Sequence, residues 1–106
     1  MKINFERSGG FAGISAAVTV DYNSLSFDER NRLKSMVDDA NFFKLSQDSP
    51  LPERGADYFK YKITIEDEEN KASHTIKTND ITMPSELRPL VKYLNGELKN
   101  KLKGNR

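Results

Sequence analysis

A glycine-rich link between two alternating segments constrains the fold of this chain most. Apolar and polar residues alternate over residues 2–7, with Ile3 and Phe5 on one face, and the alternation resumes over residues 14–22. A period of two residues is typical of a strand with one buried face. Two such strands joined by a short segment with glycines predict an antiparallel hairpin, with RSGGFAG at its connection.

A helix is expected after this hairpin. Ser26 precedes Glu29 by three residues, the spacing of a capping box in which each side chain satisfies a free backbone N–H group. Apolar residues follow at helical spacing, so they form one stripe along the helix that can dock on a sheet. At least one ring of Phe42 and Phe43 should anchor the helix end in the core. The stripe consists of Leu33, Met36, Val37 and Ala40.

A second hairpin comes next along the chain. Residues 58–65 and 72–78 alternate again, on either side of a charged turn at residues 66–71. Residues 46–57 precede this hairpin and hold two prolines and a glycine without any periodicity. They are expected to form the longest loop.

The last expected element is a helix that starts near Arg88, because Pro89 suits the first turn of a helix and no deeper position. Gly96 weakens a helix by about 1 kcal/mol relative to alanine, so residues 97–106 are expected to be a frayed basic tail. The order strand, strand, helix, strand, strand, helix predicts one α+β domain over residues 1–106. The apolar stripe of this last helix is Leu87, Leu90, Val91, Leu94 and Leu98.

Composition excludes several classes of protein. The chain has 106 residues, a formal net charge of +1 and no cysteine, so disulfides, thiolate metal sites and a general field for nucleic acid are not expected. No window approaches the roughly 20 apolar residues that span a bilayer, and the start lacks the apolar region of a signal peptide. We therefore expect a cytoplasmic protein that binds neither nucleic acid nor membrane.

Three candidate chemical sites have weak support. His74, the single histidine, lies on the inward face of a predicted strand and is expected to be structural. The acidic run at residues 66–69 lacks the alternating ligands and the glycine of a calcium loop. Gly9, Gly10 and Gly13 lead into a strand, whereas phosphate-binding glycines lead into a helix. No catalytic residue, metal site or cofactor is predicted.

The residues alone leave two interpretations of RSGGFAG open. In one, the glycines supply positive φ angles for a tight connection and Phe11 folds back on the sheet. In the other, the link exposes Phe11 as an anchor for a pocket on a partner.

Four segments, in this order, resemble the emfourin family of bacterial inhibitors of protealysin and related thermolysin-like metallopeptidases. They are RSGGFAGI, DDANFFKL, the Y-x-I-T-I pattern of residues 61–65, and MPSELRPLVKYL. The resemblance implies a four-stranded antiparallel sheet with a helix packed on one face and a C-terminal helix. It also implies no enzymatic activity, and a protein that binds a zinc peptidase of the same bacterium inside the cell and blocks its cleft.

The same resemblance suggests which residues contact the peptidase. Thermolysin-like enzymes prefer a large apolar side chain just after the bond that they cut, so the first loop resembles bait for that pocket. An inhibitory interface covers about 800 Å² on each partner, which requires a second contact from the loop at residues 46–57. Simple occlusion is expected, with zinc binding by Asp57 or Glu53 as an alternative. The predicted contact residues are Arg7, Ser8, Gly9, Gly10, Phe11, Ala12 and Gly13, with Pro52, Glu53, Gly55 and Asp57.

An alternative function is a non-enzymatic interaction module that binds a partner through the free face or an edge of the sheet. A small enzyme that uses His74 ranks last. In each case a monomer is expected when the protein is free.

Overall fold

The computed structural model describes residues 1–9, 15–51 and 58–103. The elements follow one another in the predicted order. No helix in the described part of the chain is long and apolar enough to cross a membrane. The strands are β1 (Lys2–Gly9), β2 (Ala16–Asp21), β3 (Phe59–Asp67) and β4 (Ala72–Asn79), the α-helices are α1 (Phe27–Asp39) and α2 (Arg88–Leu102), and the short 3-10 helices are η1 (Tyr22–Ser24), η2 (Phe42–Lys44) and η3 (Ser85–Leu87).

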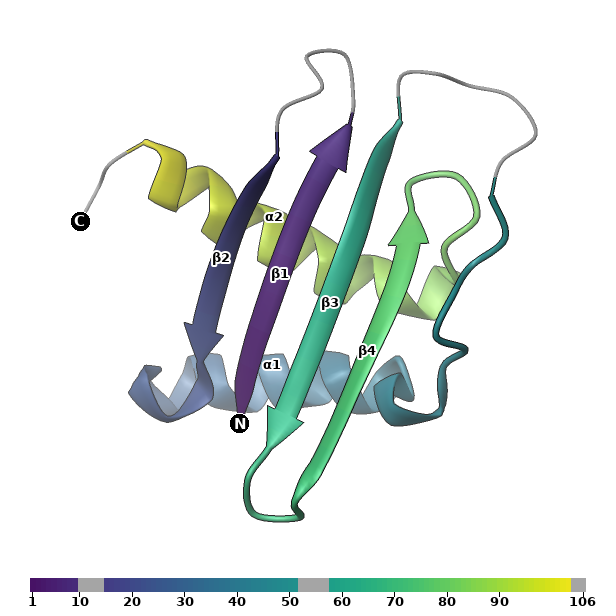
Figure 1. Cartoon of the computed structure of the whole chain (residues 1–106). Coiled ribbons are helices and arrows are strands. Elements are labelled where there is room, and N and C mark those ends of the chain that lie inside the picture. Colours follow the sequence, from purple (N-terminus) through teal and green to yellow (C-terminus); the bar gives the residue numbers. More distant parts are fainter. Residues whose placement is uncertain (10–14, 52–57, 104–106) are drawn as a thin grey trace.

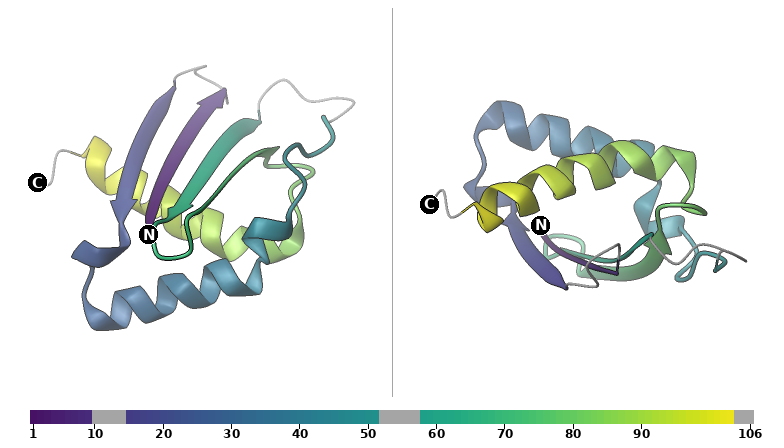
Figure 2. Two further views of the ribbon diagram at one scale, coloured as in Figure 1. Left: turned by 60° about the horizontal axis from the view of Figure 1, so that its bottom comes forward. Right: turned by 90° about the horizontal axis from the view of Figure 1, so that it is seen from above.

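The four strands form one antiparallel sheet in the order β2-β1-β3-β4. The N-terminal strand β1 is central, so that Ile3 lies between Val20 of β2 and Ile65 of β3. Both helices lie on the same side of the sheet, where α2 runs from the β4 side to the β2 side (Figures 1 and 2). The predicted α+β class and antiparallel sheet are confirmed, and the second helix joins the first on the covered face.

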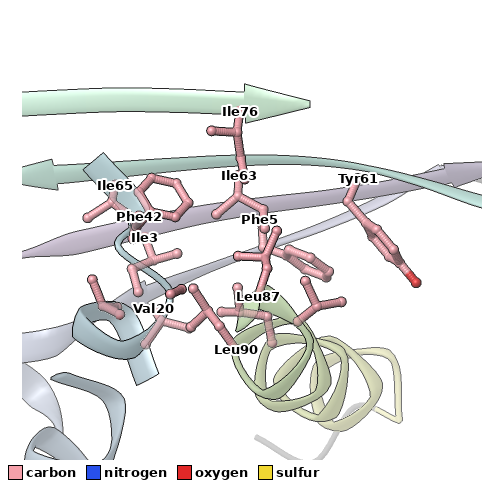
Figure 3. Packing of buried hydrophobic residues seen from close by; sticks show 14 of the residues in the cluster. Ile3, Phe5, Val20, Phe42, Tyr61, Ile63, Ile65, Ile76, Leu87 and Leu90 are labelled. Atoms are coloured by element: carbon pink, nitrogen blue, oxygen red, sulfur yellow. The ribbon is translucent and has the colours of Figure 1, made fainter. Parts of the chain in front are cut away.

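The core lies between the covered face and the helices (Figure 3). Alternate residues of the strands supply its sheet side, including Ile3, Phe5 and Ile63, which are fully buried. Every member of the predicted α2 stripe is buried as well. Burial of such side chains contributes about 1.5–3 kcal/mol each, which makes this layer the main source of stability.

Helix α1 begins as its capping residues predict. Ser26 is the N-cap, and its Oγ accepts a hydrogen bond of 3.2 Å from the backbone N–H of Glu29. Beyond its C-terminus, Phe42 is buried and meets His74 edge-on, with 5.7 Å between the ring centres. His74 Nε2 lies 2.9 Å from the carbonyl oxygen of Leu45, so this ring joins β4 to η2.

Helix α2 continues past Gly96 to Leu102, although fraying was expected from residue 97. Leu98 is fully buried, and Lys101 Nζ donates a hydrogen bond of 2.8 Å to the carbonyl oxygen of Ala17 in β2. The burial of Leu98 outweighs the cost of about 1 kcal/mol at Gly96. The expectation was therefore wrong for the residues up to Leu102.

Candidate functional site

The strand ends next to the two predicted contact loops lie at one end of the sheet. Gly9, where β1 ends, pairs with Phe59, where β3 begins, and the connections to β2 and from residue 51 leave at this end (Figure 1). We call it the loop end. Among the predicted contact residues, the described ones are Arg7, Ser8 and Gly9. The others lie outside the described residues, and their roles stay predictions: Gly10, Phe11, Ala12, Gly13, Pro52, Glu53, Gly55 and Asp57.

Gly9 requires glycine for two reasons. Its φ angle is +85°, in the region that side chains with a Cβ rarely adopt. A Cβ atom at Gly9 would also lie 2.9 Å from the carbonyl oxygen of Tyr58, which is closer than van der Waals contact allows. The backbones that lead into the two loops therefore touch at Gly9.

Arg7 points to the helix-covered side of the sheet, although it was predicted to contact a partner. Its Nη1 donates a hydrogen bond of 3.0 Å to Asn95 Oδ1 in α2, and its guanidinium carbon lies 4.5 Å from the centre of the Phe59 ring. Cation–π and hydrogen-bond contacts of this kind stabilise a side chain in one position. Arg7 thus joins β1, β3 and α2 beneath the loop end. Ser8, on the open face, is partly exposed opposite Lys60.

Asp80, directly after β4, joins the same group of side chains. Its carboxylate accepts hydrogen bonds from the Tyr61 hydroxyl and from the Phe59 backbone N–H, the latter at 2.9 Å. Asn95 Nδ2 lies 3.5 Å from the Tyr61 hydroxyl oxygen. Burial, reinforced by the bond to Asp80, raises the pKa of Tyr61 to about 12. We call Arg7, Phe59, Tyr61, Asp80 and Asn95 the brace.

Asn79 is a second polar group at this end, and it is only 2% exposed. Its Oδ1 accepts hydrogen bonds from the backbone N–H groups of Ile81 (2.9 Å) and Thr82 (2.8 Å). Its Nδ2 donates to Thr82 Oγ1 at 2.9 Å and to the carbonyl oxygen of Pro50 at 3.3 Å. The side chain therefore ties the turn after β4 to Pro50 in the second loop.

Neither group was found from the sequence. An asparagine that ends a strand is a signal for a turn, because its side chain can bond to the backbone two residues later, and Asn79 fits that rule. No local signal marks the brace, since its members come from β1, β3, α2 and the turn after β4.

The described side chains of the loop end bond to one another and to the backbone, and so support the strand ends. Within residues 1–9, 15–51 and 58–103, no three His, Cys, Asp or Glu side chains are grouped so that they could hold a metal ion. The Asp80 carboxylate accepts hydrogen bonds from the Tyr61 hydroxyl and from the Phe59 backbone N–H. What the arrangement can do is fix the strand ends from which the loops depart.

No curated protein and no solved structure matches the chain. The family model that does match is Emfourin, over residues 5–95, from Phe5 in β1 to Asn95 in α2, a range that includes the brace. A match over most of the chain establishes that the protein belongs to the Emfourin family.

Proposed function

We propose that this protein inhibits thermolysin-like zinc metallopeptidases by occluding their active-site cleft. Membership of the Emfourin family supports a role in protease inhibition in general and suggests a metallopeptidase as the partner. In this proposal the loop of residues 7–13 and the loop of residues 46–57 form the contact. The protein acts by binding and performs no catalysis.

The close approach of Gly9 to Tyr58 is the observation that supports the proposal most. The first loop leaves β1 at the residue whose backbone touches Tyr58, the residue that follows the second loop. The brace holds these strand ends against α2. Because each side chain that is ordered before binding saves about 0.5–1.5 kcal/mol, a fixed base favours tight inhibition.

Within the proposed contact, Gly10 and Phe11 enter the pocket that takes a large apolar side chain after the scissile bond. The second loop supplies Pro52, Glu53, Gly55 and Asp57 along the rim of the cleft. Two loops together can approach the roughly 800 Å² that an inhibitory interface covers on each partner. Occlusion of this kind does not require a carboxylate to reach the zinc ion.

The test is a titration of a thermolysin-like peptidase with the protein while peptide hydrolysis is followed. Phe11→Ala should raise the inhibition constant about 30-fold, as expected for an anchor that contributes roughly 2 kcal/mol, and leave the melting temperature nearly unchanged. Phe27→Ala is the matched control, because Phe27 is exposed where α1 begins, at the opposite end of β2 from the loops.

Two results would contradict the proposal. If several thermolysin-like enzymes hydrolyse peptide at an unchanged rate in the presence of micromolar protein, the protein is not an inhibitor of this class. A fall in melting temperature for Phe11→Ala, with an unchanged inhibition constant, would assign Phe11 to the protein's own core, where its loss costs about 3–5 kcal/mol.

A second candidate function is binding of a non-peptidase partner through the open face of the sheet. This face is not covered by either helix (Figure 2), and it is hollowed near the loop end, between Glu6, Lys62 and Leu51. Recovery of a non-peptidase protein that wild type binds, and that a Lys62→Glu variant does not bind, would favour this candidate.

A further inference from the structure

Two large apolar side chains are exposed at the loop end. Leu51 is 76% exposed and lies within the second loop, while Ile81 is 52% exposed in the turn between β4 and η3. Single exposed apolar residues are common on protein surfaces and need no explanation. These two differ because one buried side chain fixes the backbone beside both of them.

That side chain is Asn79. Its amide bonds to the backbone N–H of Ile81 and to the carbonyl oxygen of Pro50, the residue before Leu51. Thr82 Oγ1 adds a donor bond of 2.6 Å to the same Pro50 oxygen. The chain at residues 50–51 and the chain at residues 81–82 are therefore held next to each other.

The turn that carries Ile81 is also fixed on its other sides. The backbone N–H of Asp80 donates to the carbonyl oxygen of Phe59 at 3.1 Å, and that of Met83 donates to the carbonyl oxygen of Asn79 at 3.2 Å. Arg88, at the start of α2, donates a bond of 3.1 Å to the carbonyl oxygen of Asp80. Met83 itself is buried, which anchors the end of the turn in the core.

The backbone beside Leu51 and Ile81 is held by hydrogen bonds, although neither side chain is buried in the core. Burial of an asparagine is unfavourable unless its polar atoms are bonded, and here both the oxygen and the nitrogen of Asn79 are bonded. Yet Leu51 and Ile81, whose backbones are so firmly held, bury little of their own surface. Apolar side chains displayed on a fixed backbone are the form that binding anchors take at protein interfaces, since little entropy is lost on docking.

We infer that Leu51 and Ile81 form an apolar anchor pair that docks on an apolar surface of the target peptidase beside its cleft. The inference rests on the proposed function. The occupant follows from continuity, because Leu51 is itself part of the loop of residues 46–57, the second proposed contact loop. A second copy of this chain on the same pair would cover that loop and compete with the peptidase.

The experiment compares inhibition constants for Leu51→Ser, Ile81→Ser and the double variant against the same peptidase as above. Each single change should raise the inhibition constant about tenfold, and the double change more than either single one. Melting temperatures should stay close to that of the wild type, because both side chains are largely exposed. Phe27→Ser is the matched control, since it removes another exposed apolar side chain away from the loop end, and its inhibition constant should equal that of the wild type.

The outcomes separate this inference from the proposed function. If Leu51→Ser and Ile81→Ser inhibit as well as Phe27→Ser while Phe11→Ala is weakened, the anchor pair is overturned and the function stands. If the wild type inhibits no thermolysin-like enzyme, both the anchor pair and the proposed function are wrong. A wild-type dimer that Leu51→Ser converts to a monomer, with an unchanged inhibition constant, would assign the pair to self-association and overturn the inference.

Discussion

At the scale of single residues, Gly9 and Arg7 show that residues of a family motif can serve the fold. Both belong to the RSGGFAG segment that resembles the inhibitor family. Gly9 permits the contact between β1 and the Tyr58 backbone, and Arg7 reaches Asn95 on α2. Gly10 and Phe11, which we propose to enter the peptidase pocket, follow directly after Gly9, so Arg7 and Gly9 support the strand end that leads to them.

Gly9→Ala should lower the free energy of unfolding by about 1–3 kcal/mol, because it places a Cβ at φ +85° and against the Tyr58 carbonyl oxygen. Denaturant unfolding measures this loss. The inhibition constant should rise as well, since the two strand ends must move apart. A variant as stable as the wild type would show that the close approach at Gly9 is not needed.

At the scale of elements, α2 depends on its buried stripe more than on the helix propensity of each residue. Leu90, Leu94 and Leu98 are fully buried, so the helix tolerates glycine at position 96. Gly96 is exposed, and a Cβ there would meet no atom within 4 Å. Its position carries a cost in helix stability without any packing reason.

Gly96→Ala should therefore raise the free energy of unfolding by about 0.5–1 kcal/mol, with no change in inhibition. The two glycine variants form a matched pair, measured in the same denaturant series, with opposite expected signs. A loss of stability in Gly96→Ala would mean that α2 needs flexibility at this point.

At the scale of the whole molecule, the Tyr61 hydroxyl of the brace links β3 to the turn after β4 and to α2, and Arg7 links β1 to α2. Tyr61 is almost fully buried and holds its proton to a pKa of about 12, above the ordinary value of about 10. The unfolded chain releases this proton from about pH 10, whereas the folded protein keeps it. The stability that this adds is complete below pH 10 and is lost as the pH rises to 12.

Between about pH 10 and 12 the wild type should thus lose roughly 1–3 kcal/mol more stability than Tyr61→Phe does. Denaturant unfolding of both proteins from pH 9 to pH 11.5 measures the difference in slope. Burial also raises the pKa of Tyr93, but that residue is common to both proteins and cancels in the comparison. Parallel slopes would show that Tyr61 ionises as freely in the folded protein as in the unfolded chain.

The sequence alone determined the elements whose signals are local. The alternation of β1 and β3, the cap at Ser26, the stripe of α2 and the burial of at least one ring of Phe42 and Phe43 were all predicted and confirmed, the buried ring being that of Phe42. These features follow from period, capping chemistry and apolar spacing, which act over a few neighbouring residues. The family resemblance likewise came from short segments in order, and the family model confirms it.

The contacts between those elements, in contrast, follow from tertiary packing and could not be read from local sequence. Tertiary packing placed β1 between β2 and β3, turned Arg7 toward Asn95, carried α2 past Gly96 and buried Asn79 between two loops. Each of these outcomes depends on atoms that are distant along the chain. Periodicity assigns a residue to a face of its own strand or helix, whereas the partner that it meets there is set by how the sheet and the helices pack.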